Sequence, residues 1–123
     1  FITKKFIKTN FGYIQIYYFI KKIVTNNNWY LYKYNSITKI DSNSIELFSY
    51  ATVEEFLNEY ENLDRNFPVY LDSDLGNILG EDFVEKLNSL GFNEIHMVTG
   101  KDPSKILKNK HLFKTITGKK PPF

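Results

Sequence analysis

The chain has 123 residues, enough for one hydrophobic core, and its formal net charge of +2 is too small to indicate nucleic-acid binding by itself. It contains no cysteine, which excludes disulfides, thiolate metal ligands and cysteine nucleophiles. The apolar stretch 11–20 is interrupted by Gln15 and no cleavable signal pattern is visible, so we expect a cytoplasmic protein that contacts neither nucleic acid nor membrane.

The first 43 residues give the weakest structural pattern. Residues 1–19 alternate apolar and polar side chains around Asn10-Phe11-Gly12, which predicts a hairpin in an N-terminal extension. The domain proper is expected to span residues 20–123. Its first strand is predicted at Lys22–Thr25, and the spacing of apolar residues over 29–40 predicts its first helix.

From residue 44 onward, predicted strands and helices alternate. The sequence Thr52-Val53-Glu54-Glu55 is a capping box, in which the Thr hydroxyl and the second Glu carboxylate satisfy free backbone amides at a helix start. Gly91 follows the last apolar position of a second helix, where a left-handed cap is usual. The predicted strands are 44–50, 68–71, 95–98 and 113–117, and the predicted helices begin at 52, 81 and 102, the last two ending near 90 and 110.

This alternation is typical of an α/β fold, a doubly wound parallel five-stranded sheet with helices on both faces and a flavodoxin-like topology. In such sheets the chemistry lies at the carboxyl ends of the strands. Asp72 follows one predicted strand, Thr99 ends the next, and Lys119 and Lys120 follow the last. An acid, a hydroxyl and an ammonium at successive strand ends predict a site that handles a phosphoryl group.

The run D-S-D-L-G-N-I-L-G, from Asp72 to Gly80, resembles the receiver domain of two-component response regulators. Receivers carry an acceptor aspartate, a leucine or methionine three residues later, and a glycine eight residues later. Asp72, Leu75 and Gly80 match these positions, although the proline usual after the leucine is Gly76 here. The resemblance covers roughly residues 20–123.

Two further matches lie closer to the C-terminal end. Thr99-Gly100 is similar to the hydroxyl-then-small pair of the family, and Lys120-Pro121 is similar to its Lys-Pro, with Lys119 as the alternative lysine. The ending Gly-Lys-Lys-Pro-Pro-Phe resembles receivers found at the ends of hybrid sensor kinases. The fold expected from the resemblance is again the flavodoxin-like parallel sheet.

The resemblance implies that Asp72 is a nucleophile that accepts a phosphoryl group from a histidine kinase or phosphotransfer protein. Thr99 would bond a phosphoryl oxygen, and the lysine at 119 or 120 would pair with the acyl phosphate. Receivers hold Mg²⁺ with the acceptor and an acidic pair after the first strand. Spacing aligns Asn27 and Asn28 with that pair, and neutral amide oxygens bind Mg²⁺ more weakly than carboxylates.

We therefore expect a degenerate receiver, in which Asp72 is a phosphoacceptor or the domain acts as a pseudo-receiver through protein contacts, a second copy of the chain included. An alternative resemblance is to the haloacid dehalogenase family of phosphatases and phosphotransferases, with Asp72 as nucleophile and Asp74 as general acid/base. A purely structural interaction domain is the third possibility. Asp74 is also a common type of turn residue, and His96 is expected to be a packed core residue rather than a catalyst.

Overall fold

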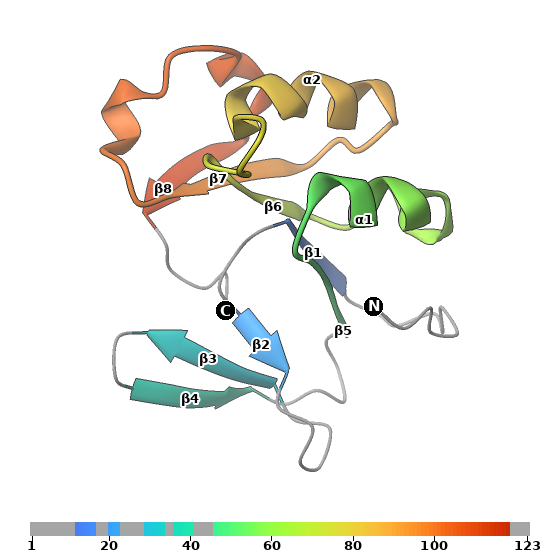
Figure 1. Cartoon of the computed structure of the whole chain (residues 1–123), viewed down its shortest axis with the longest axis vertical. Helices are drawn as coiled ribbons and strands as arrows, with labels where there is room; N and C mark the ends of the chain where they lie inside the picture. Colours follow the sequence, from blue (N-terminus) through green and yellow to red (C-terminus); the bar gives the residue numbers. More distant parts are fainter. Residues whose placement is uncertain (1–11, 17–19, 23–28, 34–35, 41–45, 119–123) are drawn as a thin grey trace.

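The computed structural model describes residues 12–16, 20–22, 29–33, 36–40 and 46–118 of the chain (Figure 1). Its main feature is a parallel sheet of five strands in the order β5-β1-β6-β7-β8. The strands are β1 (Gly12–Ile16), β5 (Glu46–Tyr50), β6 (Val69–Asp72), β7 (Ile95–Thr99) and β8 (Thr115–Gly118). This order is the flavodoxin-like one, which confirms the α/β class predicted from the sequence.

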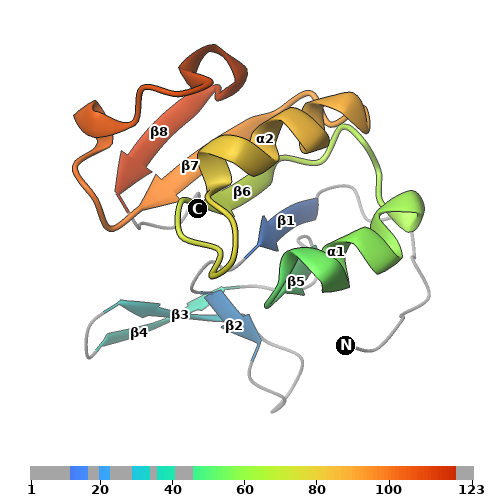
Figure 2. The ribbon, with the colours of Figure 1, turned by 45° about the horizontal axis from the view of Figure 1, so that its top comes forward.

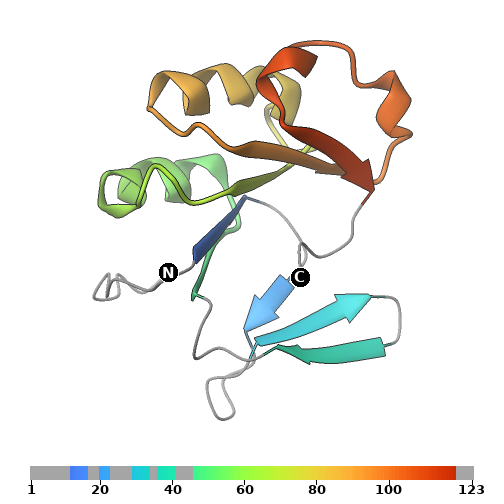
Figure 3. The same ribbon diagram turned by 180° about the vertical axis from the view of Figure 1, so that it is seen from behind.

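The part of the sequence between β1 and β5 forms a second, antiparallel sheet. Its three strands, in the order β2-β3-β4, are β2 (Ile20–Lys22), β3 (Trp29–Lys33) and β4 (Ser36–Ile40). Figures 1 and 3 show it on the side of the parallel sheet that faces away from the helices. The connection that would supply a helix to that face in a doubly wound sheet therefore contains strands instead.

The N-terminal part differs from the sequence prediction. The first strand is Gly12–Ile16 rather than Lys22–Thr25, and it pairs with both β5 and β6. It is thus an inner strand of the main sheet, so a boundary near residue 20 does not separate an extension from the domain. The predicted helix over 29–40 was wrong, because these residues form the β3–β4 hairpin. The hairpin predicted within 1–19 falls mostly on residues outside the described ranges.

The helices of the parallel sheet are α1 (Val53–Glu59), continued by the 3₁₀ turn η1 (Tyr60–Asn62), and α2 (Gly80–Ser89). Both lie on one face of the sheet (Figure 2), as right-handed crossovers that advance in one direction along the sheet require. The predicted capping box is present. The Thr52 hydroxyl accepts a hydrogen bond from the backbone amide of Glu55 at 3.2 Å, and the Glu55 carboxylate accepts one from the backbone amide of Ala51 at 2.9 Å. Neither described helix has the length and apolar character needed to cross a bilayer.

The connection between β7 and β8 also departs from its predicted helix. It contains two 3₁₀ turns, η2 (Pro103–Lys105) and η3 (Lys110–Leu112). Asn109 stands between them with a φ of 56°, a left-handed conformation that no continuous helix allows. Its side-chain amide donates to the Glu81 carbonyl and to the Glu85 carboxylate, both at 2.8 Å. Contacts with α2 therefore fix this segment in place of helical hydrogen bonds.

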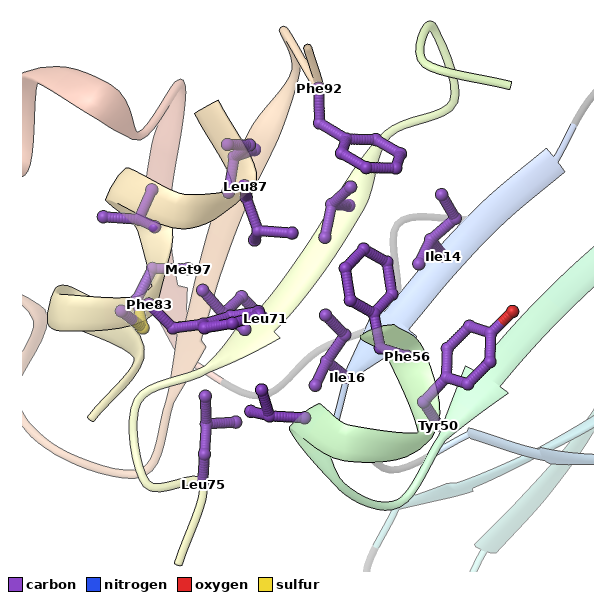
Figure 4. Packing of buried hydrophobic residues seen from close by; sticks show 14 of the residues in the cluster. Ile14, Ile16, Tyr50, Phe56, Leu71, Leu75, Phe83, Leu87, Phe92 and Met97 are labelled. Atoms are coloured by element: carbon purple, nitrogen blue, oxygen red, sulfur yellow. The ribbon is translucent and has the colours of Figure 1, made fainter. Parts of the chain in front are cut away.

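The hydrophobic core lies between the parallel sheet and the two helices (Figure 4). Ile14 from β1 and Leu71 from β6 contribute fully buried side chains from the sheet. Phe56 of α1 is fully buried at the centre, with the Phe83 ring at 6.1 Å and the Phe92 ring at 5.6 Å. This aromatic cluster joins α1 to α2 and holds both helices on the sheet.

Candidate functional site

The candidate site is the carboxyl edge of the parallel sheet, where β6 ends at Asp72 and the adjacent β7 ends at Thr99. Both residues are almost fully buried, with 3% and 2% of their surface exposed. The chain leaves β1 toward β5 on one side and leaves β6 toward β7 on the other, so the switch point of the sheet lies between β1 and β6. Ligands bind at such switch points in open α/β sheets. The structure thus brings two of the predicted site residues to the predicted edge, beside that point.

The strand register determines the direction of the two side chains. Asp72 is paired with Val98, so both point to the same face of the sheet. Thr99 is the next residue after Val98 and points to the opposite face, which the helices cover. The carboxylate and the hydroxyl are therefore neighbours along the edge but leave the sheet on opposite sides. A group bound to both would have to extend over the strand ends.

Both side chains also take part in local turns. The Thr99 hydroxyl accepts a hydrogen bond from the backbone amide of Lys101 at 3.0 Å. One Asp72 carboxylate oxygen accepts from the Asp74 amide at 3.4 Å, and Asp74 in turn accepts from the Gly76 amide at 3.0 Å. Asp74 is exposed and acts as a turn residue, as expected from its sequence context.

The loop from β6 to α2 is held tightly against the strand that carries Asp72. The Gly80 amide donates to the Ser73 carbonyl at 2.7 Å. A Cβ atom at Gly80 would overlap the Asp72 carbonyl oxygen and lie 3.1 Å from the terminal methyl carbon of Met97. Leu75, only 5% exposed, anchors the middle of the loop in the core (Figure 4). Leu75 and Gly80, which match the receiver pattern, thus hold the loop in the core and against the backbone of Asp72.

The remaining predicted site residues are not positioned. Lys119, Lys120, Asn27 and Asn28 all lie outside the described residues, so the expected ammonium and amide ligands have no geometry to assess. The alignment of the two asparagines was also based on a first strand at 22–25. Because the first strand of the sheet is β1 instead, Asn27 and Asn28 are not the residues that follow it.

The residues that follow β1 in the sequence are Tyr17 and Tyr18, which carry no carboxylate. In the described part of the chain, no group of three or more His, Asp or Glu side chains is arranged to hold a metal ion. The donor set of this edge, as far as it is described, therefore does not fit the Mg²⁺ site that the receiver resemblance implied.

A polar cluster around His96 lies on the face of the parallel sheet opposite the helices. The sequence predicted that His96 is packed, but not which polar groups it contacts. His96, 7% exposed, is a packed residue as predicted, and its ring stacks on Tyr70 at 4.7 Å. Its Nδ1 lies 2.6 Å from the Thr115 hydroxyl, and its Nε2 lies 2.8 Å from a Glu94 carboxylate oxygen. Burial, followed by the influence of Tyr13 and then of Glu94, raises the pKa of Tyr70 to about 12. The cluster joins edge strand β8 to β7 through satisfied polar groups.

The fold and the edge together define an α/β domain of flavodoxin-like strand order with a buried aspartate beside its switch point. No protein-family model, no curated protein and no solved structure matches the chain. The strand order and the residues at the carboxyl edge are therefore the features that indicate a function.

Proposed function

We propose that the chain is a receiver-like signalling domain that acts through protein–protein contacts and in which Asp72 occupies the phosphoacceptor position. The observation that supports this most is the location of Asp72 at the end of β6, next to the switch point of a flavodoxin-like sheet. Leu75 in the core and Gly80 against the Asp72 backbone agree with the receiver pattern. The proposed partners are a histidine kinase or phosphotransfer protein in the cytoplasm.

Several features favour a pseudo-receiver over an efficient phosphoacceptor. Phosphoryl transfer depends on positive charge positioned around the transferred group. The residues that follow β1, Tyr17 and Tyr18, supply no carboxylate for Mg²⁺, so no step through that ion is proposed. The Thr99 hydroxyl leaves the sheet on the face opposite Asp72. The domain would therefore signal by binding a partner rather than by forming an acyl phosphate.

The haloacid dehalogenase-type reaction receives less support. It would require Asp74 to move protons to and from a substrate at a site closed to water. Asp74 is exposed, and its carboxylate accepts a hydrogen bond from the backbone amide of Gly76 in the turn after β6. We therefore propose no phosphatase activity for the chain.

Acetyl phosphate with Mg²⁺ tests the pseudo-receiver proposal on the wild-type protein. We expect the intact mass to show no added phosphoryl group, and beryllofluoride with Mg²⁺ to leave the amide NMR spectrum unchanged. The Asp72→Asn variant is the matched control, because it cannot form an acyl phosphate at this position. A Mg²⁺-dependent mass increase that disappears in the variant would show that the chain is an active receiver. Turnover of an aryl phosphate that depends on Asp72 would instead support the dehalogenase-type reaction.

A further inference from the structure

Two segments of opposite formal charge lie toward opposite edges of the parallel sheet, and Figure 2 shows the path of both. The acidic surface is the segment 53–64, formed by α1, η1 and the two residues after them, near β5. The segment itself contains no lysine or arginine, although the Arg65 guanidinium packs over its Tyr60 ring. Its acids are Glu54, Glu55, Glu59, Glu61 and Asp64. The basic surface is the connection 101–114 between β7 and β8. It carries a single acid, Asp102, and contains the lysines Lys101, Lys105, Lys108, Lys110 and Lys114.

The basic surface presents an apolar side chain between its charges. Leu107 is 74% exposed, far more than any other large hydrophobic residue in the described part of the chain. Lys105 and Lys110 on either side of it in the sequence are both exposed. The segment is held against α2 by the hydrogen bonds of Asn109 to Glu81 and Glu85, beside an exposed ion pair between Lys108 and Asp82. Leu107 is therefore presented by a segment that is already ordered before any partner binds.

The acidic surface has the same pattern with the opposite sign. Glu54 and Leu57 are three residues apart, which brings them to one side of α1, and Glu61 follows in η1. Both glutamates are exposed, and Leu57 between them is only partly buried. Each surface thus has a leucine flanked by two like charges.

We infer that the acidic surface of one copy of this chain binds the basic surface of another copy, head to tail. Leu107 would cover Leu57, while the flanking lysines face the flanking glutamates. Because the two surfaces differ, the contact is heterologous and leaves a free surface of each kind at the ends of the assembly. Exposed charges steer association and are screened by salt, so the contact would be weak and salt-sensitive. This inference does not depend on any role of Asp72.

Sedimentation velocity with charge-reversed variants tests the inference. At about 50 mM salt we expect the wild-type sedimentation coefficient to rise with protein concentration up to about 100 μM, and at about 500 mM salt we expect it to stay constant. Lys105→Glu/Lys110→Glu and Glu54→Lys/Glu61→Lys should each weaken self-association by at least about tenfold. An equimolar mixture of the two double variants should associate again, because each then offers the surface that the other requires.

The exposed Lys86 on α2 supplies a control, since Lys86→Glu changes the net charge as one lysine reversal does but lies outside both surfaces. It should associate as the wild type does. A wild-type protein that stays monomeric at low salt would overturn the inference, as would a mixture of folded double variants that fails to associate. Binding of DNA or anionic vesicles through Lys105 and Lys110, without self-association, would also overturn it and assign the basic surface to a polyanion.

Discussion

Replacing Phe56 with alanine should lower the free energy of unfolding by about 4 kcal/mol, the usual cost of removing a fully buried phenylalanine ring. The side chain has no exposed surface and lies at the centre of the aromatic cluster between α1 and α2. It also packs on Tyr50 of β5, with ring centroids 5.6 Å apart, so the cavity would touch the sheet as well as both helices. Since domains are commonly stable by only about 5–15 kcal/mol, this change would remove a large share of the stability.

Denaturant unfolding followed by circular dichroism measures this effect. Leu57→Ala is the matched control, because Leu57 is the next residue of the same helix and is only partly buried. We expect its cost to be about 1 kcal/mol. Equal losses for the two variants would contradict the placement of Phe56 at the centre of the core.

Gly80→Ala should destabilise the domain by about 2–4 kcal/mol. The added methyl group would overlap the Asp72 carbonyl oxygen and press on Met97, so α2 would have to move away from β6. Helix propensity alone acts in the opposite direction, because alanine is better than glycine within a helix by about 1 kcal/mol. The sign of the change therefore distinguishes a close helix–strand approach from an ordinary helix start.

Gly100→Ala is the control for this variant. Outside Gly100 itself and its two chain neighbours, no atom lies within 4 Å of a Cβ placed at this residue, so the stability of the variant should stay within about 0.5 kcal/mol of the wild type. Thermal or denaturant unfolding of the two variants side by side measures the difference. A Gly80→Ala protein as stable as the wild type would contradict the packing of the β6–α2 loop against Asp72.

The second half of the fold, apart from the connection between β7 and β8, was predictable because its signals are local. The capping box at Thr52 and Glu55 and the left-handed Gly91, with a φ of 97°, depend only on neighbouring residues. The apolar strands that end at Asp72 and Thr99 stand out for the same reason. Their common edge follows directly from a parallel sheet, and the structure has that edge as predicted.

The inner strand β1 was missed because its sequence alternates like a surface strand. Parallel inner strands are usually continuous apolar runs, but β1 contains Tyr13 and Gln15, both buried. Gln15 is accommodated by donating a hydrogen bond to the Ser49 hydroxyl of β5 at 2.6 Å. That partner is 34 residues away in the sequence, so no local pattern reveals it.

Contacts between residues far apart in the sequence also explain the other differences between the predicted and the observed fold. The spacing over 29–40 is compatible with a helix, but its Trp and Tyr side chains also favour strands, and pairing between β3 and β4 decides the outcome. The break at Asn109 depends on hydrogen bonds to α2. The opposite directions of Asp72 and Thr99 follow from the register of β6 against β7, which the sequence does not specify.

The role of Asp72 is tested most directly by supplying the carboxylates that receivers have after their first strand. A Tyr17→Asp/Tyr18→Asp double variant, treated with acetyl phosphate and Mg²⁺, should gain the mass of one phosphoryl group, while the wild-type protein gains none. Adding Asp72→Asn to the double variant should abolish the modification. A double variant that is folded by circular dichroism and yet gains no phosphoryl group dependent on Asp72 would contradict the assignment of this residue to the phosphoacceptor position.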